Sequence, residues 1–200
     1  MLTSEASTAY ELALDEFMAI QVVRDVPGIY HAVRKLAYFS SGERSAAAVM
    51  RTGRGACTAK HILLRDLLRR QGARAEVELV QGDFAAGLPQ VASMSLPLRE
   101  MIRAAGVPDF HCYVVWQGPE HEVRLDATWP DALVSCGFPV NAGWAGSGDT
   151  KLAITPDGIT ERAEDVIGAK ARLLASLTAE QADKRRQFLT LLSNWIATIS

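Results

Sequence analysis

A cysteine at the start of a predicted helix is the residue of this chain best suited to act as a nucleophile. Gly53 and Gly55 precede Cys57, and a leucine-rich segment with helical periodicity follows it as far as Gly72. The free backbone amides of a helix N-terminus carry about half a positive charge, which stabilises a thiolate. Because the thiolate is the nucleophilic form, Cys57 is suited to attack a carbonyl carbon, and its backbone amide to bind the developing oxyanion.

A predicted β-hairpin brings a histidine and an aspartate together. Residues 111–116 and 121–128 have the aromatic, β-branched and alternating pattern of two strands, with a Gly-Pro turn between them. A four-residue loop, 117–120, sets a register in which His111 and Asp126 are direct cross-strand neighbours on one face. Such neighbours have Cβ atoms about 4.5–5.5 Å apart. A two-residue loop, Gly118-Pro119, sets the same register, whereas other loop lengths or a bulge would break this match.

These residue types are the ones that thiol acyl transfer needs. A histidine takes the thiol proton as a base and returns it to the leaving group as an acid. A carboxylate on the other ring nitrogen fixes the tautomer of the imidazole. His61 is a rival base because residues i and i+4 share one side of a helix, but it has no visible carboxylate partner. The sequence therefore predicts Cys57, His111 and Asp126 as a catalytic triad.

Metal binding is an alternative interpretation of the same region. Cys57, His61, His111 and Cys112 could be drawn as four ligands. No Cys-x-x-Cys motif or paired histidine spacing supports such a site. Strand alternation also sends the side chains of His111 and Cys112 to opposite faces. We therefore expect neither a metal site nor a cofactor.

The motifs occur in an order that resembles the transglutaminase-like superfamily, a branch of the papain-like cysteine enzymes. The matching segments are Val-Arg-Asp-Val at 23–26, Gly-Ala-Cys at 55–57, Phe-His-Cys-Tyr at 110–113 and Leu-Asp-Ala-Thr-Trp at 125–129. The resemblance covers roughly residues 20 to 130. It implies an α+β fold in which the nucleophile helix packs on an antiparallel sheet, and it places the catalytic cysteine, histidine and aspartate of the family on Cys57, His111 and Asp126.

The resemblance also implies a reaction class, which is acyl transfer from an amide or peptide carbonyl through a thioester. Water as acceptor would make the protein a peptidase or amidase, and an amine would make it a transglutaminase-like transferase. The expected substrates are peptides, proteins or other amides. Residues 58–61, Thr-Ala-Lys-His, differ from the acidic or aromatic residues that follow the cysteine in many relatives. This difference leaves the acyl donor and acceptor open.

Two alternatives to this reaction class stay open. One is a non-catalytic peptide-binding or scaffolding module of the same fold, although such a module would have no chemical need for the cysteine, histidine and aspartate together. The other is an acyltransferase of the arylamine N-acetyltransferase type, since residues 51–57 loosely resemble the arginine and glycine approach to the nucleophile of those enzymes.

Length and composition limit the remaining possibilities. Two hundred residues with 48% hydrophobic content suffice for one domain, 1–200, with a core over about 20–155 and a helical extension over about 160–200. A net charge of −2 supplies no basic field for nucleic acid. Three cysteines favour a reducing compartment, and we expect a cytoplasmic protein. The apolar run 12–23 contains acidic residues, so we expect no membrane span.

The periodicity predicts the elements that surround the site. Helices are expected over 4–24, 29–39, 42–51 and 96–105. Strands are expected over 74–80, in the same sheet as the hairpin, and over 151–155. Two helices are expected between 161 and 200, and their apolar residues either cover the core or form a homodimer surface. Amphipathic helices usually face a core, which favours the first interpretation.

Overall fold

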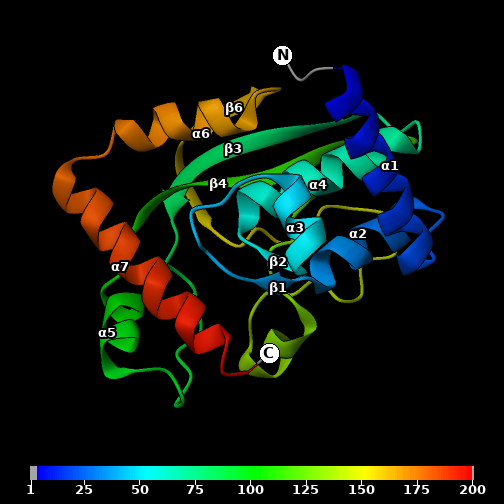
Figure 1. Cartoon of the computed structure of the whole chain (residues 1–200). Coiled ribbons are helices and arrows are strands. Elements are labelled where there is room, and N and C mark those ends of the chain that lie inside the picture. The colour runs from blue at the N-terminus through cyan, green and yellow to red at the C-terminus, as the bar shows by residue number, and fades with distance from the viewer. Residues whose placement is uncertain (1–3, 200) are drawn as a thin grey trace.

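The computed structural model describes residues 4–199, with side chains from residue 7, and has mixed α and β structure (Figure 1). Its fold class is α+β, as the sequence predicted. The helices are α1 (Ser4–Gln21), α2 (Val26–Lys35), α3 (Ala46–Thr52), α4 (Cys57–Arg70), α5 (Leu96–Ala104), α6 (Val166–Ala175) and α7 (Ala179–Ile196), and residues Asp131–Cys136 form a 3-10 turn.

The central sheet has four strands in the order β5-β4-β3-β6, and all three neighbouring pairs are antiparallel. The strands are β3 (Ala75–Asp83), β4 (Pro108–Gln117), β5 (Glu122–Leu125) and β6 (Thr155–Ala163). Two short strands, β1 (Ala37–Tyr38) and β2 (Arg54–Gly55), form a separate parallel pair just before α4. The predicted strand over 74–80 is confirmed as β3, which pairs with β4.

The last strand lies later in the chain than we predicted. The structure has β6 at Thr155–Ala163 rather than at 151–155. Pro156, Asp157 and Gly158 lie inside this strand, although these residue types usually indicate a turn. An edge strand tolerates them because one side of it needs no ladder hydrogen bonds, and β6 is an edge strand whose side chains are mostly exposed.

The register of the β4–β5 hairpin is shifted from the predicted one. Trp116 pairs with Val123 and Gln117 with Glu122, so the loop is 118–121 rather than 117–120. The Gly118 amide donates to the His121 carbonyl across this loop at 3.0 Å. The predicted register was therefore wrong by two residues. A shift of two keeps every side chain on its original face, because side chains in a strand alternate with a period of two.

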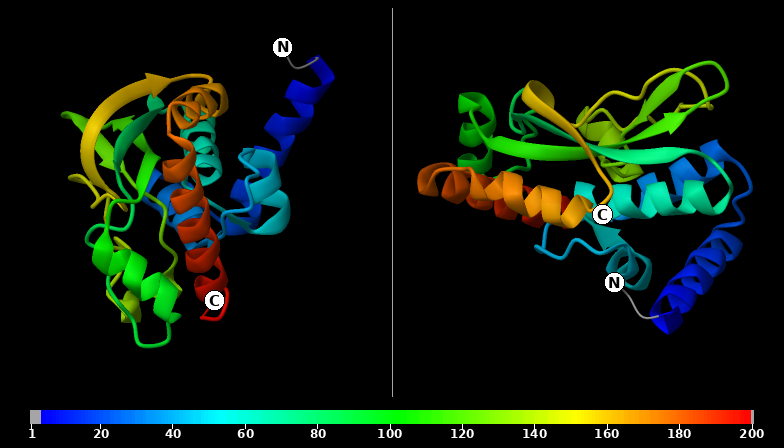
Figure 2. Two further views of the ribbon diagram at one scale, coloured as in Figure 1. Left: turned by 90° about the vertical axis from the view of Figure 1, so that its left-hand side faces the viewer. Right: turned by 90° about the horizontal axis from the view of Figure 1, so that it is seen from above.

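Each face of the sheet carries its own apolar cluster. Helix α4 packs on β3 and β4 on the first face, where α1, α2, α3 and α6 add further apolar side chains. Figure 2 shows α4 and α6 on the same side of the long strands. Leu63, Leu64, Leu67 and Leu68 of α4 are fully buried there. The expected arrangement of a cysteine-bearing helix on an antiparallel sheet is therefore observed.

The second face of the sheet is covered only in part. Near the start of β4, residues of α5, α7 and the 127–154 segment form the second apolar cluster. Phe188, Leu192 and Ile196 of α7 are fully buried in it, so the C-terminal helices cover the core as expected. Nearer the end of β4, this face carries charged side chains, including Arg162 paired with Glu78 and Glu122. The alternative, a homodimer surface on the C-terminal helices, stays open.

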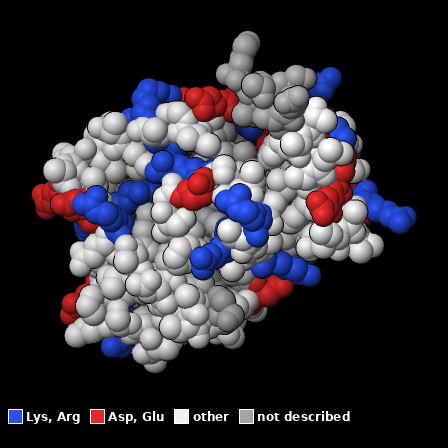
Figure 3. Space-filling view, in the orientation of Figure 1, with Lys and Arg blue, Asp and Glu red and all other residues white. Residues whose placement is uncertain are grey.

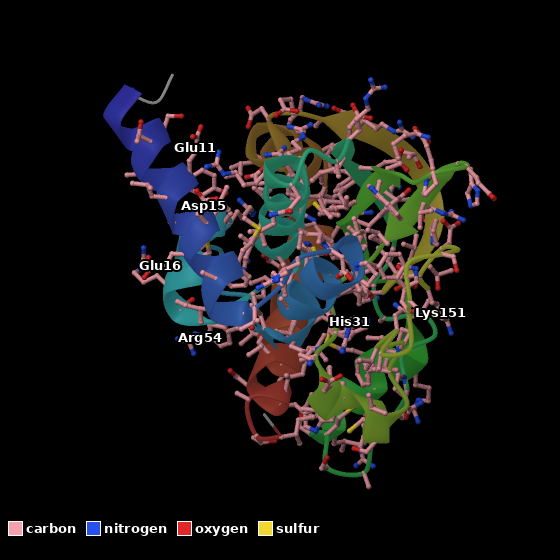
Figure 4. All side chains as sticks on the ribbon, turned by 90° about the vertical axis from the view of Figure 1, so that its right-hand side faces the viewer. Glu11, Asp15, Glu16, His31, Arg54 and Lys151 are labelled. Atoms are coloured by element: carbon pink, nitrogen blue, oxygen red, sulfur yellow. The ribbon has the colours of Figure 1, made fainter. Side chains whose placement is uncertain are left out.

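Helix α1 lies along one edge of the molecule (Figure 4). Its residues Glu11 and Asp15 pair with Arg70 in the last turn of α4, the closest approach being 2.6 Å between Asp15 Oδ2 and Arg70 Nη2. These ion pairs are on the surface, where such pairs contribute little stability. Among the described residues, none of the helices combines the length and apolar character that a membrane span requires.

Candidate active site

The structure brings His111 and Asp126 together. His111 lies on β4 and is fully buried, and Asp126 follows the end of β5 at 2% exposure. His111 Nε2 is 2.7 Å from Asp126 Oδ2. In the observed register these two residues are diagonal rather than direct neighbours, but they share a face and the chain turns after Leu125. The predicted side-chain pair is therefore present although the register that predicted it was wrong.

Backbone amides fix the Asp126 carboxylate in place. The Thr128 amide donates to Oδ1 at 2.9 Å and the Ala153 amide donates to Oδ2 at 2.7 Å. Burial opposes ionisation, but the His111 charge and its hydrogen bond outweigh it and hold the pKa of Asp126 well below its usual range. The backbone of Asp126 is held as well, because its amide donates to Thr150 Oγ1 at 2.6 Å. Asp126 is therefore an ionised, immobile partner for the imidazole.

Cys57 is the first residue of α4 and is 5% exposed. The approach to it is set by the short parallel pair, in which Tyr38 is paired with Gly55. A Cβ atom at Gly55 would lie 2.7 Å from Val49 Cγ2, so this position requires glycine. Ala56 is the N-cap and supplies no side-chain hydrogen bond to the first turn. The amides of that turn are thus free of a side-chain cap beside the thiol.

The surroundings of Cys57 favour its thiolate. Its pKa lies well below the ordinary value, first because of the neighbouring Cys112 side chain and, against the effect of burial, because of the positive charges of His111 and Lys170. Burial lowers the pKa of His111, but the charges of Asp126 and of the Cys57 thiolate raise it to about 10. The directions of the two pKa shifts favour a thiolate–imidazolium pair over a neutral thiol and imidazole.

The two nitrogens of His111 have different tasks. Nε2 is bound to Asp126, whereas Nδ1 is buried and has no well-aligned hydrogen-bond partner among the described residues. Because Nε2 is taken, Nδ1 is the nitrogen available to the Cys57 thiol. The structure thus holds Asp126 against His111 Nε2 and brings Cys57 close enough to His111 for each group to shift the pKa of the other.

This pairing predicts an unusual pH profile for thiol alkylation. Between pH 6 and 9 we expect the rate at which iodoacetamide alkylates Cys57 to depend less on pH than that of an ordinary cysteine, because the lowered pKa of the thiol favours the thiolate. A change in rate should follow near pH 10, as His111 loses its proton. The rate at Cys112, whose pKa is raised by its hydrogen bond with Cys57 and by burial, should still be rising at pH 9. Peptide mass spectrometry after timed alkylation measures both rates.

His111→Ala is the matched variant for this profile. Without the imidazolium, the Cys57 rate should fall at pH 6 and titrate closer to the usual cysteine pKa of about 8.5. A wild-type profile with a single inflection near that value, or one unchanged in the variant, would contradict the ion pair.

His61 makes a poor rival base. Its Nδ1 is 2.8 Å from the Cys57 carbonyl, and its Nε2 accepts a hydrogen bond from the Ala127 amide at 2.8 Å. Since the amide can only donate, Nε2 carries no proton and Nδ1 donates. Burial lowers the pKa of His61 to about 4, so the ring stays neutral. His61 therefore links the first turn of α4 to the segment around Asp126, with no nitrogen left for the thiol.

Among the residues that the structure describes, no group of three or more histidine, cysteine, aspartate or glutamate side chains has an arrangement that could hold a metal ion. Two of the cavities show where the site lies. A pocket of about 540 Å³ between the end of α4 and the β3–β5 surface contains none of the three site residues. Cys57 instead lines a small pocket of about 60 Å³. The thiol pocket is the one that bears on chemistry.

The sequence did not reveal that Lys60 supports the site. Lys60 is fully buried, and its Nζ donates to the carbonyls of Arg34, Leu36 and Thr128 at 2.9–3.0 Å. Burial lowers its pKa to about 7. The ammonium joins the end of α2, the residue before β1 and the segment after Asp126. No sequence signal marks these partners, because all three are backbone atoms far from Lys60 along the chain.

A second group missed by the sequence analysis comes from three elements. Asp109 of β4, Lys170 of α6 and Arg185 of α7 form a cluster of buried or half-buried charges that lines the Cys57 pocket. Lys170 and Arg185 lie more than a hundred positions after Cys57. The one signal in the sequence that could have indicated Lys170 and Arg185 is a charged residue on the side of each amphipathic helix that faces the core.

No protein-family model matches this chain, and a comparison with curated proteins finds no match.

Proposed function

We propose that this protein is a thiol acyl-transfer enzyme with a papain-like core of the transglutaminase type, and that Cys57, His111 and Asp126 are its catalytic triad. One observation carries the proposal. The Asp126 carboxylate holds His111 Nε2 at 2.7 Å, which leaves Nδ1 for a cysteine at the start of a helix whose thiol pKa is lowered. A buried ion pair of this kind, aimed at a pocket, is the arrangement of an activated nucleophile.

The first half of the reaction follows from the protonation states. The Cys57 thiolate adds to the carbonyl carbon of an amide or ester, and the carbonyl π electrons move to oxygen. The uncapped first turn of α4, including the Cys57 amide, donates hydrogen bonds to that oxyanion. The His111 imidazolium gives its proton to the leaving nitrogen or oxygen as the C–N or C–O bond breaks. The products are a thioester on Cys57, the released amine or alcohol, and a neutral imidazole.

The second half reverses these roles. Neutral His111 takes a proton from water or from an acceptor amine, which then adds to the thioester carbonyl. The C–S bond breaks, the thiolate leaves, and the thiolate–imidazolium pair is restored. Water yields a hydrolase of the peptidase or amidase type, and an amine yields a transferase. Asp126 stays ionised throughout and keeps the ring orientated.

The proposal is tested by trapping the acyl-enzyme. The purified protein is mixed with short p-nitrophenyl esters and with a library of peptide amides, quenched in acid within seconds, and examined by intact and peptide mass spectrometry. We expect an acyl adduct on Cys57 that decays over time. Cys57→Ala should form none, whereas Cys136→Ala, which changes a half-buried thiol outside the triad, should acylate like the wild type.

One result would favour the non-catalytic alternative. If Cys57 alkylates readily with iodoacetamide but no ester or amide leaves an acyl group on it, the thiol is accessible and yet does not perform acyl transfer. The proposed reaction would then be wrong, and the fold would be a binding module.

A further inference from the structure

The pocket at Cys57 has a cationic wall built by the C-terminal helices. Lys170 Nζ lies 2.8 Å from Asp109 Oδ1 and also donates to the Phe110 carbonyl. Arg185 Nε donates to the same Asp109 oxygen at 2.8 Å. The exposures of Lys170 and Asp109 are 1% and 2%. One buried carboxylate therefore holds two cations in place beside the thiol.

The charges around this pocket do not balance. Its charged lining residues are Glu43, Arg44, Asp109, Lys170 and Arg185, which are three cations and two carboxylates. Burial opposes the ionisation of Asp109, but both cations hold its pKa far below the usual range, so it counts as fully negative. Beside this wall, the His111 imidazolium lies between the Cys57 thiolate and the Asp126 carboxylate, so the imbalance is confined to the wall itself. There Lys170 and Arg185 share the single Asp109 carboxylate at a partly desolvated position, which favours an anion.

Arg185 has unused hydrogen-bonding capacity. Only its Nε is engaged, and neither Nη1 nor Nη2 has a hydrogen-bond partner among the described residues. Asp109 fixes the plane of the guanidinium from one side. The two Nη groups therefore present the forked donor geometry that matches both oxygens of a carboxylate.

Arg185 also stands where two cavities meet. It lines the small pocket with Cys57 and a neighbouring pocket of about 360 Å³. The wall of the neighbouring pocket includes Leu174, Leu177 and Leu189. Figure 3 shows basic side chains over α7 and between α7 and the segment before α3 on this face of the molecule. Arg185 and Leu189 line both pockets, so a ligand that occupies both would contact the guanidinium.

We propose that this pocket binds a free carboxylate of the acyl donor, with Arg185 as the residue that recognises it. The substrates would then be amides or esters that carry a carboxylate close to the carbonyl attacked by Cys57, with an apolar portion in the outer pocket. This inference deepens the proposed function and rests on it, because the bound molecule is a substrate only if Cys57 performs acyl transfer. The binding of an anion beside Cys57 is independent of acyl transfer, and the experiment uses this difference.

The test compares two alkylating reagents that differ by one carboxylate. Iodoacetate and iodoacetamide each transfer a two-carbon group to sulfur and release iodide, one as carboxymethyl and the other as carbamidomethyl, but only iodoacetate is an anion. The ratio of their rates at Cys57 cancels the thiolate fraction, since both reagents need the thiolate. We expect Arg185→Gln to lower the iodoacetate-to-iodoacetamide ratio about tenfold, the size of one charge-assisted hydrogen bond.

Two further variants make the result specific. Arg172→Gln removes one positive charge from α6 at an exposed ion pair with Glu161, so the ratio should stay within about twofold of the wild type. Arg185→Lys keeps a charge for Asp109 but loses the fork, so the ratio should fall even if Arg185→Gln folds poorly. An unchanged ratio in folded Arg185→Lys, or an equal fall in Arg172→Gln, would overturn the proposal.

A parallel measurement separates this inference from the proposed function. Mono-p-nitrophenyl succinate and p-nitrophenyl butyrate are esters of similar length with and without a carboxylate. Faster acylation of Cys57 by the succinate ester, lost in Arg185→Lys, supports both proposals. Equal acylation by the two esters leaves acyl transfer standing and overturns carboxylate recognition. No acylation by either ester, together with an Arg185-dependent alkylation ratio, supports the anion site and counts against acyl transfer.

Discussion

Replacing Asp126 by asparagine is expected to lower the rate of Cys57 acylation by about 10²- to 10⁴-fold while the protein still folds. The carboxylate accepts hydrogen bonds from His111 Nε2, from the Ala153 amide and from the Thr128 amide. An asparagine has one acceptor oxygen, so its NH₂ group must face a donor on one side. When that donor is His111, the ring is pushed to the tautomer with its proton on Nδ1, which cannot accept the thiol proton.

The measurement is single-turnover acylation of Cys57 by an activated ester, followed by quenched-flow mass spectrometry. Glu122→Ala is the matched control. It removes a carboxylate from the same hairpin, but Glu122 is exposed and pairs with Arg162 on the surface. The Glu122→Ala variant should retain most of the wild-type rate of Cys57 acylation. If Asp126→Asn acylates like the wild type while Glu122→Ala fails, the carboxylate has been assigned to the wrong residue.

Replacing Lys60 by methionine is expected to lower the free energy of unfolding by about 3–5 kcal/mol. Methionine fills a similar volume, but it leaves the carbonyls of Arg34, Leu36 and Thr128 without their donor. The first two lie at the end of α2, where the helix has no intrahelical partners for its last carbonyls. The ammonium also lies at the negative end of that helix dipole, so its loss removes a favourable charge.

Urea denaturation followed by tryptophan fluorescence and by circular dichroism measures this loss. Lys35→Met is the control, because Lys35 is exposed at the end of the same helix and its removal should change the free energy of unfolding by no more than about 0.5 kcal/mol. Equal stability of the two variants would show that the three carbonyls find other partners, and that Lys60 does not join the segments of the site.

The sequence predicted the members of the site better than their spacing. Alternation places His111 and Asp126 on one face for any register that shifts by an even number of residues, so the pair survived an error of two. The position of Cys57 followed from glycines before it and leucines after it, which are local signals. The sequence was therefore sufficient to predict features that depend only on a local residue pattern or on which face of a strand a side chain occupies.

Other features depend on contacts between distant parts of the chain, and no local pattern encodes them. The strand β6 contains Pro156 and Gly158, and it exists because β3 offers it a free edge. The helix pattern does not distinguish Lys60 from an ordinary polar residue, because its three backbone carbonyl partners lie in other segments of the chain. The pairing of Lys170 and Arg185 with Asp109 needs α6 and α7 in their final places. Tertiary packing decides all of these.

The distribution of the site along the chain has a consequence for biosynthesis. Cys57 and Lys170 are separated by 113 positions, since 170 minus 57 is 113. A ribosome that adds about 5–20 residues per second therefore exposes the thiol roughly 6 to 23 seconds before the cation that helps to ionise it. His111 and Asp126 also emerge after Cys57. The nascent chain thus carries an ordinary, weakly reactive thiol until β4, with Cys112 and His111, has packed against α4, and the contribution of Lys170 follows when α6 docks.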